Sequence, residues 1–172
     1  MFSKKSVKYS SIGFLFSLIG LSSIGSFAFA DSDLKGNAED SPCFITDGKV
    51  GNLGECLLII KSFNESRIPF KIAEDTTLVG IEVIGNKMIQ RYDVSYGGDA
   101  DFNDDESFDA LRNVYIKALP NTSNKTCNLD STSGIFYKNG LINEYRYRVN
   151  GSEREVIITL DEKYCSDINW NK

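Results

Sequence analysis

The chain has 172 residues, of which 24 are acidic, 19 are basic and none is histidine, so its formal net charge is −5. The lack of histidine excludes Ser-His-Asp and Cys-His nucleophiles, HExxH metal sites and histidine acid–base catalysis. The acidic balance argues against nucleic acid and anionic lipid surfaces as partners, because their phosphates attract basic faces. We therefore expect no catalytic residue, no cofactor and no metal ligand.

Residues 1–30 have the features of a removable secretory signal peptide. Lysines at the start of the chain precede an apolar run over 12–21, and Ala28-Phe29-Ala30 fits the small-residue rule for signal peptidase. The apolar run is about ten residues long, whereas a membrane-spanning helix needs roughly 20. We therefore expect cleavage before Asp31 and no integral membrane segment after signal cleavage.

The rest of the chain is expected to lie outside the cytoplasm, in the periplasm or secreted. Residues 31–42 are polar and lack periodicity, which predicts a flexible leader. Residues 43–172 are long enough for a single domain with its own core. Because the signal contains lysines but no acidic residue, cleavage leaves the remaining chain more acidic. That charge suits a basic protein partner, since complementary charges steer encounter.

Four cysteines lie beyond the signal, and an even number in an oxidising compartment predicts two disulfides. Three pairings are possible. We predict Cys43–Cys56 and Cys127–Cys165, because the first pair lies in an N-terminal segment of its own. The intervening loop contains three glycines and is expected to be a turn or a short hairpin. A zinc site is the alternative, but the chain has neither a CxxC motif nor histidine.

The next segments are a short apolar run and a predicted hairpin. Residues 57–63 (LLIIKSF) are compatible with a buried strand or a helix, and periodicity does not decide between them. A helix here would not continue through Pro69. Residues 77–84 and 87–96 are predicted strands, joined by the two-residue turn Gly85-Asn86.

An acidic loop over 99–106 partly resembles a calcium-binding loop. Asp99, Asp101 and Asn103 occupy the first, third and fifth positions of such a loop. The sixth position holds Asp104 instead of glycine, and the twelfth holds Ala110 instead of a bidentate glutamate. Solvation of the loop and charge at a helix start explain the acidic residues equally well, so we expect no calcium site.

Two helices are predicted after this loop. Apolar residues at helical spacing predict a helix over 108–119, and Pro120 marks its end. The acidic residues at 104–106 lie near its start, where the helix dipole favours negative charge. A second short helix is expected over 130–137, capped by Asp130 and closed by Gly140.

A second hairpin completes the predicted fold. Residues 141–149 and 153–160 are expected strands, and Asn150-Gly151 between them is a strong type I′ turn signal. The predicted fold class is therefore α+β: an antiparallel sheet of two hairpins, with two helices between them on one face, held by disulfides.

Tyrosines on two of the predicted strands form the only candidate binding surface. Tyrosine is favoured at protein interfaces, but aromatic residues are also common where strands pack against helices, and we favour the packing interpretation. The arginines of the second hairpin are expected on the opposite, solvated face. The tyrosines are Tyr92, Tyr96, Tyr145 and Tyr147, and the arginines are Arg146, Arg148 and Arg154.

The C-terminal half resembles the α+β pilotins of bacterial type II secretion, over about residues 80–165. The matching pieces are MIQRYDVSY, the helix over 108–119, Cys127, Gly140, EYRYRVNGS and IITLDEKYC. Pilotins bind a segment of the secretin, escort it to the outer membrane and are normally lipoproteins. This chain lacks the lipobox cysteine and has the Cys43–Cys56 segment in addition. The resemblance implies a pilotin-like fold and a protein partner.

The sequence thus favours a non-enzymatic, periplasmic or secreted protein-binding domain, such as a pilotin-like accessory of a secretion or envelope system. The alternative is an immunity or inhibitor protein that binds a toxin or hydrolase, suggested by the acidic surface and the two disulfides. An enzyme that uses carboxylates alone is a third hypothesis.

Overall fold

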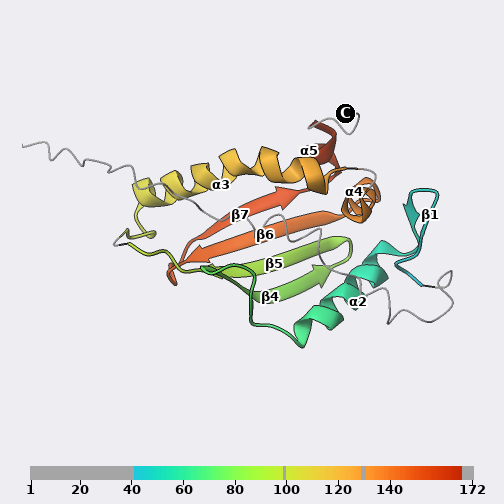
Figure 1. Ribbon diagram of the computed structural model, residues 1–172, viewed down its shortest axis with the longest axis horizontal. Helices are drawn as coiled ribbons and strands as arrows, with labels where there is room; N and C mark the ends of the chain where they lie inside the picture. The colour runs from blue at the N-terminus through green and yellow to red at the C-terminus, as the bar shows by residue number, and fades with distance from the viewer. Residues whose placement is uncertain (1–40, 99, 129–130, 168–172) are drawn as a thin grey trace, which may run out of the picture.

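The protein has an α+β fold, as the sequence predicts. The computed structural model describes residues 41–98, 100–128 and 131–167, in which four helices accompany a five-stranded and a two-stranded sheet (Figure 1). The predicted signal peptide over 1–30 lies outside the described residues. So do residues 31–40 of the predicted leader, Asp99 and Asp130.

The five-stranded sheet has the order β3-β4-β5-β6-β7. Its strands are β3 (Phe70–Lys71), β4 (Thr76–Ile84), β5 (Lys87–Val94), β6 (Ile142–Val149) and β7 (Glu155–Leu160). The alternating β-branched and aromatic residues of these segments suit a sheet that buries one face. The short edge strand β3 was not predicted.

Turns with positive φ angles close both predicted hairpins, with two residues between β4 and β5 and a longer connection between β6 and β7. In the first, Ile84 pairs with Lys87, and Gly85 has a positive φ of 58°. In the second, Asn150 and Gly151 have φ angles of 48° and 70°. A type I′ turn requires positive φ at both central residues, which Asn-Gly tolerates best. Both hairpin predictions are confirmed.

The two hairpins join through a parallel pair, so the sheet is mixed and the prediction of an antiparallel sheet is wrong at its centre. β5 pairs with β6 in register from Lys87↔Ile142 to Val94↔Val149. The chain between them runs back along the sheet as helices, which returns it to the end where β5 began. A crossover of this kind gives a parallel neighbour, whereas a hairpin turn gives an antiparallel one.

The segment 57–63, for which the sequence left strand and helix open, is helical. It belongs to α2 (Leu53–Glu65), which ends before Pro69 as expected. The side chain of Asn52 accepts a hydrogen bond from the backbone N–H of Glu55 at 3.2 Å, a typical N-cap. One stripe of α2 packs against β4; its buried apolar residues are Leu53, Cys56, Leu57 and Ile60.

The next helix is longer than predicted. α3 spans Asp105–Thr126, so the prediction that Pro120 ends it is wrong. A proline inside a helix removes one backbone hydrogen bond but does not always terminate the helix. The helix starts at Asp105, near the predicted start at residue 108. At this end the Asp104 carboxylate accepts a hydrogen bond from the backbone N–H of Ser107 at 3.0 Å. This hydrogen bond is the main reason why the pKa of Asp104 lies below its ordinary value.

Two short helices flank the last hairpin. α4 spans Thr132–Lys138, and Ser131 caps it by accepting from the backbone N–H of Gly134 at 3.1 Å. The cap is therefore Ser131 rather than Asp130. Gly140 follows α4 with a φ of 89°, which confirms its predicted role in closing the helix. The last helix, α5 (Glu162–Asp167), was not predicted.

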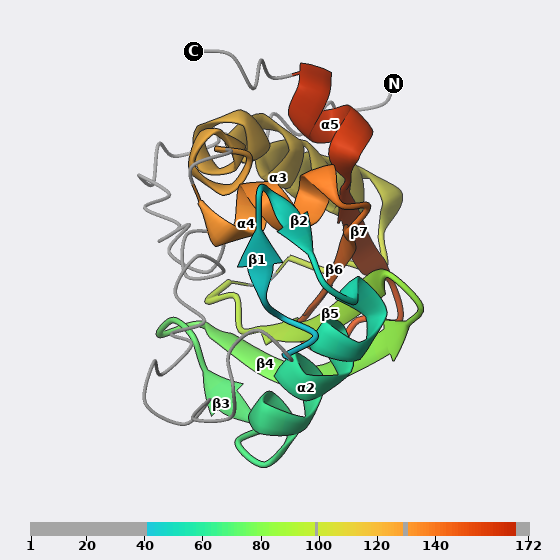
Figure 2. The same ribbon diagram turned by 90° about the vertical axis from the view of Figure 1, so that its right-hand side faces the viewer.

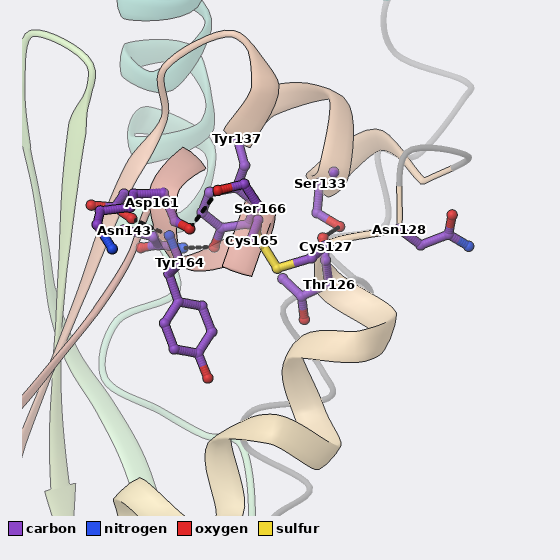
Figure 3. The surroundings of a disulfide bond; sticks show 12 residues. Thr126, Cys127, Asn128, Ser133, Tyr137, Asn143, Asp161, Tyr164, Cys165 and Ser166 are labelled. Carbon is purple, nitrogen blue, oxygen red and sulfur yellow. Dashed lines mark hydrogen bonds between the residues drawn. A yellow bond between two sulfur atoms is a disulfide. The ribbon is translucent and has the colours of Figure 1, made fainter. Parts of the chain in front are cut away.

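The disulfides link Cys43 to Cys56 and Cys127 to Cys165, the pairing that the sequence predicts. The first closes the loop that contains the small hairpin of β1 (Ile45–Thr46) and β2 (Lys49–Val50). Asn139, the C-cap of α4, holds this hairpin in place, since its side chain accepts from the backbone N–H of Val50 and donates to the carbonyl oxygen of Gly48. Figure 2 shows the hairpin beside α4. The second disulfide joins the end of α3 to α5 (Figure 3).

The core lies between the helices and one face of the five-stranded sheet, here called the inner face. α2 runs alongside β4, toward one edge of the sheet, and α3 runs alongside β7, at the opposite edge (Figure 1). Buried side chains from both helices, α4 and the sheet form one cluster. The inner-face members on the three central strands are Leu78, Ile81, Met88, Tyr92, Val94, Tyr145, Tyr147 and Val149.

A chain of polar side chains crosses this core. Tyr92 donates through its hydroxyl to Gln90 at 2.7 Å, and the Gln90 amide donates to Asn143 at 2.9 Å. The Asn143 amide in turn donates to the Tyr145 hydroxyl at 2.6 Å. All four side chains are buried. Because a buried polar group without a partner is costly, this chain of hydrogen bonds fixes one arrangement of β5 against β6.

Candidate functional site

The second face of the five-stranded sheet, here called the outer face, is the candidate site. Strand alternation turns every second side chain away from the core. The side chains of the outer face, from β4 to β7, are Thr77, Glu82, Ile84, Lys87, Ile89, Arg91, Asp93, Ile142, Glu144, Arg146, Arg148, Glu155, Ile157 and Thr159. Most of them are exposed or half-buried, and none belongs to the core cluster. Among the described residues, α2 and α3 pack on the inner face, and no helix contributes to a cluster on the outer face.

Ion pairs cross the outer face from strand to strand, and we call the connected set the charge ladder. Arg91 lies 3.2 Å from Glu82 and 3.9 Å from Glu155. Glu155 also lies 3.6 Å from Arg146, which binds Glu144. The ladder ends where Lys87 contacts Glu144; its members are Glu82, Arg91, Glu155, Arg146, Glu144 and Lys87. It contains as many acidic as basic side chains, so this face is electrically balanced.

Glu144 is the most enclosed charge of the ladder, with a side chain only 10% exposed. Arg146 donates to one of its oxygens through Nε at 2.7 Å and through a terminal nitrogen at 2.6 Å. Burial would raise the pKa of Glu144, but the hydrogen bonds and charges of Lys87 and Arg146 outweigh burial and lower that pKa. The same contact with Glu144 raises the pKa of Arg146.

We expect Glu144→Gln to lower the free energy of unfolding by about 2 kcal/mol at neutral pH. The substitution removes the negative charge that Lys87 and Arg146 share. A carboxyl group whose pKa is lowered on folding stabilises above its unfolded pKa, about 4.3 for glutamate. This stabilisation is lost as the pH falls through the folded value. Urea unfolding of both proteins at pH 7 and pH 3 should therefore show a smaller difference at pH 3 than at pH 7.

Asp93→Asn is the matched control for this comparison. Asp93 accepts two hydrogen bonds from Arg148, at 3.1 and 3.3 Å, but both side chains are nearly half exposed. Exposed ion pairs contribute less than about 1 kcal/mol. A Glu144→Gln effect of equal size at both pH values would mean that the charge of Glu144 is not what stabilises the fold.

Isoleucines lie beside the charges of the outer face. Ile157 is 51% exposed and pairs in register with Arg146, and Ile142 is 39% exposed beside Lys87. Ile89 is only 4% exposed, although it lies outside the core cluster. Apolar side chains next to arginines, with a polar surround, are typical of protein–protein interfaces.

The edge strand β7 extends this surface. It pairs with β6 on one side and has no strand on its other side among the described residues. Exposed edges are commonly protected by lysine, proline or a bulge. β7 has none of these, and its sequence is EVIITL. Instead, α3 runs alongside β7 (Figure 1), and a helix beside an edge strand is another such protection.

The predicted tyrosine surface does not form, because three of its four residues are in the core. Tyr92, Tyr145 and Tyr147 are between 0% and 4% exposed. The rings of Tyr92 and Tyr147 stack at 5.1 Å, and Tyr147 stacks on Tyr115 of α3 at 4.6 Å. For these three residues the packing interpretation, which the sequence favours, is confirmed, and the alternative of a binding surface is wrong. The half-buried Tyr96 lies edge-on to Phe102, at 5.3 Å.

The residues of the calcium-like loop make local contacts. Asp101 accepts from the backbone N–H of Asn103 at 2.9 Å, and Asn103 accepts from the backbone N–H of Glu153 at 3.0 Å. Asp99 lies outside the described residues. Within the part of the chain that the structure describes, no three Cys, Asp or Glu side chains are grouped as metal ligands would be.

The arginines divide between the two sides of the sheet. Arg146 and Arg148 lie on the outer face as predicted, whereas Arg154 contacts α3. Its guanidinium lies 3.7 Å from the centre of the Phe108 ring and 2.8 Å from Asp105. Sequence reasoning missed Glu144 and Ile157 as candidate site residues. The alternation of the two hairpins places both opposite the tyrosines, and that signal could have found them.

Comparisons with known proteins give little guidance. No protein-family model matches the chain, and no curated protein matches it significantly. A crystal structure of a Pseudomonas aeruginosa protein, provisionally described as secreted, is similar at a TM-score of 0.49 and 18% identity. The match covers 70% of this chain and 98% of that one. None of these three comparisons confirms the resemblance to pilotins, which stays a hypothesis.

The fold and the site together define a disulfide-linked α+β domain with one open sheet face. Its two disulfides fit a compartment outside the cytoplasm. No helix within 41–98, 100–128 or 131–167 has the length and apolar character needed to span a membrane.

Proposed function

We propose that this protein is a non-enzymatic, periplasmic or secreted protein-binding domain whose binding surface is the outer face. The observation that carries the proposal is the open face itself, with exposed isoleucines set among paired charges. A sheet face that is fully solvated needs no exposed isoleucines, whereas a protein interface uses such residues as anchors.

The charge ladder supports recognition rather than catalysis. Each carboxylate of the outer face contacts a lysine or an arginine, and the pKa of the most enclosed one, Glu144, lies below its ordinary value. A general acid needs the opposite, a carboxyl group whose pKa is raised toward neutrality. Ion pairs that are already formed also keep long side chains in place, which lowers the entropy cost of binding.

The balanced charge of the outer face favours a protein as its ligand. A nucleic acid would require an excess of basic side chains, and here acidic and basic residues alternate. A partner segment that is mixed in charge and carries apolar side chains would match both features. In a pilotin-like accessory this segment would belong to an envelope protein, which is the role that the resemblance implies.

An immunity or inhibitor protein is the second candidate, favoured by the start of α3. Four acidic side chains are exposed there: Asp104, Asp105, Glu106 and Asp109. Such a surface would steer a basic toxin or hydrolase toward the protein. Protection of cells in a co-expression assay, lost when these four residues are replaced by amides, would favour this candidate over the first.

We expect Ile157→Glu to reduce partner binding by about tenfold or more, because it places a charge in the apolar part of the interface. The matched control is Ile116→Glu on α3, a position that is 45% exposed but distant from the outer face. Each variant and the wild type would be immobilised and exposed to the same envelope extract, with bound proteins quantified by mass spectrometry.

The proposal requires a protein that the wild type and Ile116→Glu retain equally and that Ile157→Glu retains poorly. Equal recovery by all three, or recovery of no protein by any of them, would contradict it. Circular dichroism of each variant checks that the fold is intact.

A further inference from the structure

The helix α2 exposes a second apolar patch, separate from the outer face. Leu58, Ile59 and Phe63 are 50%, 42% and 43% exposed, on the side of α2 opposite its buried stripe. A surface helix normally carries one apolar stripe and a polar opposite face. Three adjacent large apolar side chains on the solvent-exposed side of the helix therefore mark α2 as an interaction surface.

The charges at the two ends of this patch are of opposite sign. Glu55 lies in the first turn of α2, and Arg67 follows its last turn with its guanidinium 4.3 Å from the centre of the Phe63 ring. Lys61 and Glu65 pair with each other at 3.4 Å. Among the described residues, neither Glu55 nor Arg67 has an ion-pair partner. The patch thus has an acidic end and a basic end.

We propose that this face binds the α2 helix of a second copy of the chain, in antiparallel orientation about a twofold axis. Glu55 and Arg67 are equally far from Lys61 along the chain, and so are Ile59 and Phe63. An axis level with Lys61 therefore places Glu55 of one copy beside Arg67 of the other, and Ile59 beside Phe63. A twofold interface requires such self-complementarity, in which each contact occurs twice.

Local features suit close helix packing. Ser62 is exposed within the patch and is small, which allows two helices to approach. The Cys43–Cys56 disulfide and the Asn52 cap hold the N-terminal end of α2, so the face is ordered before association. The leader over 31–42 contains only Leu34 and Ala38 as apolar residues besides Pro42, too few to cover the patch in place of a second copy.

The test is the oligomeric state of the purified protein, measured by sedimentation equilibrium over a range of concentrations. We expect a monomer–dimer equilibrium for the wild type and a dimer Kd at least about tenfold weaker for Ile59→Glu. Ile157→Glu is the matched control, because it introduces the same charge on the outer face and should leave the dimer Kd unchanged. The same two variants therefore separate dimer formation from the proposed partner binding.

Charge reversal tests the antiparallel orientation. Glu55→Arg and Arg67→Glu should each weaken the dimer about tenfold, because each replaces two symmetric attractions by repulsions. The double variant restores opposite charges across the axis and should regain wild-type affinity. A wild type that is monomeric at all concentrations, or a dimer that Ile59→Glu leaves intact, overturns the proposal. A double variant no better than the singles overturns the antiparallel arrangement.

Discussion

Above pH 10 the protein should unfold in one steep transition, because burial raises the pKa values of five tyrosines in its core. They are Tyr92, Tyr115, Tyr137, Tyr145 and Tyr147. A tyrosine whose pKa is raised on folding leaves stability unchanged below its unfolded pKa of about 10. Between that value and the folded pKa, each such tyrosine should lower stability by about 1.4 kcal/mol per pH unit.

The measurement is an alkaline titration followed by tyrosinate absorbance and far-ultraviolet circular dichroism together. Both signals should change in the same transition, since the buried hydroxyls ionise only when the core opens. Tyr147→Phe keeps the ring that stacks on Tyr92 and Tyr115 and removes one ionising group. It should make the transition less steep. Complete tyrosine ionisation with unchanged circular dichroism would show that these hydroxyls reach solvent in the folded protein.

Removing the Cys127–Cys165 disulfide should destabilise the protein more than removing Cys43–Cys56. The two bridges span 38 and 13 residues. In the chain-entropy model, a longer closed loop restricts the unfolded chain more, which gives about 4 kcal/mol for the first bridge and about 3 kcal/mol for the second. The longer bridge also holds α3 against α5, at the rim of the core (Figure 3).

Urea unfolding of the two double-alanine variants checks this order. Both variants remove two buried or half-buried sulfurs, so the loss of apolar contacts is similar and the difference reports mainly loop length. A larger loss of unfolding free energy for the Cys43–Cys56 variant would mean that the effect comes mainly from loss of structure in α2 and the β1–β2 hairpin, rather than from the entropy of the unfolded chain.

Local sequence signals predicted the two hairpins and, closely, the start of α3, because their causes lie within a few residues. Asn150-Gly151 tolerates the positive φ angles of its turn, and Asp104 accepts from a backbone N–H of the first turn of α3. The pairing of the disulfides was also predictable, since Cys43 and Cys56 share one short loop.

The candidate site was only partly predictable. Alternation along β6 separated Tyr145 and Tyr147 from Arg146 and Arg148, which identified two faces. The packing interpretation also placed the tyrosines against the helices and the arginines in solvent, as the structure has them, except that Arg154 contacts α3. The enclosure of Glu144 by Lys87 and Arg146 depends on the neighbouring strand, so a reading of one strand at a time could not find it.

The sequence by itself determined the elements whose stability is local: the turns, the caps, the loop-closing bridges and the alternation of the strands. Only the tertiary structure decided that β5 and β6 run parallel and that residues 57–63 form a helix. Each of these depends on contacts between segments far apart in the chain. Their free energy comes from burying apolar surface against a particular neighbour, which no local pattern specifies.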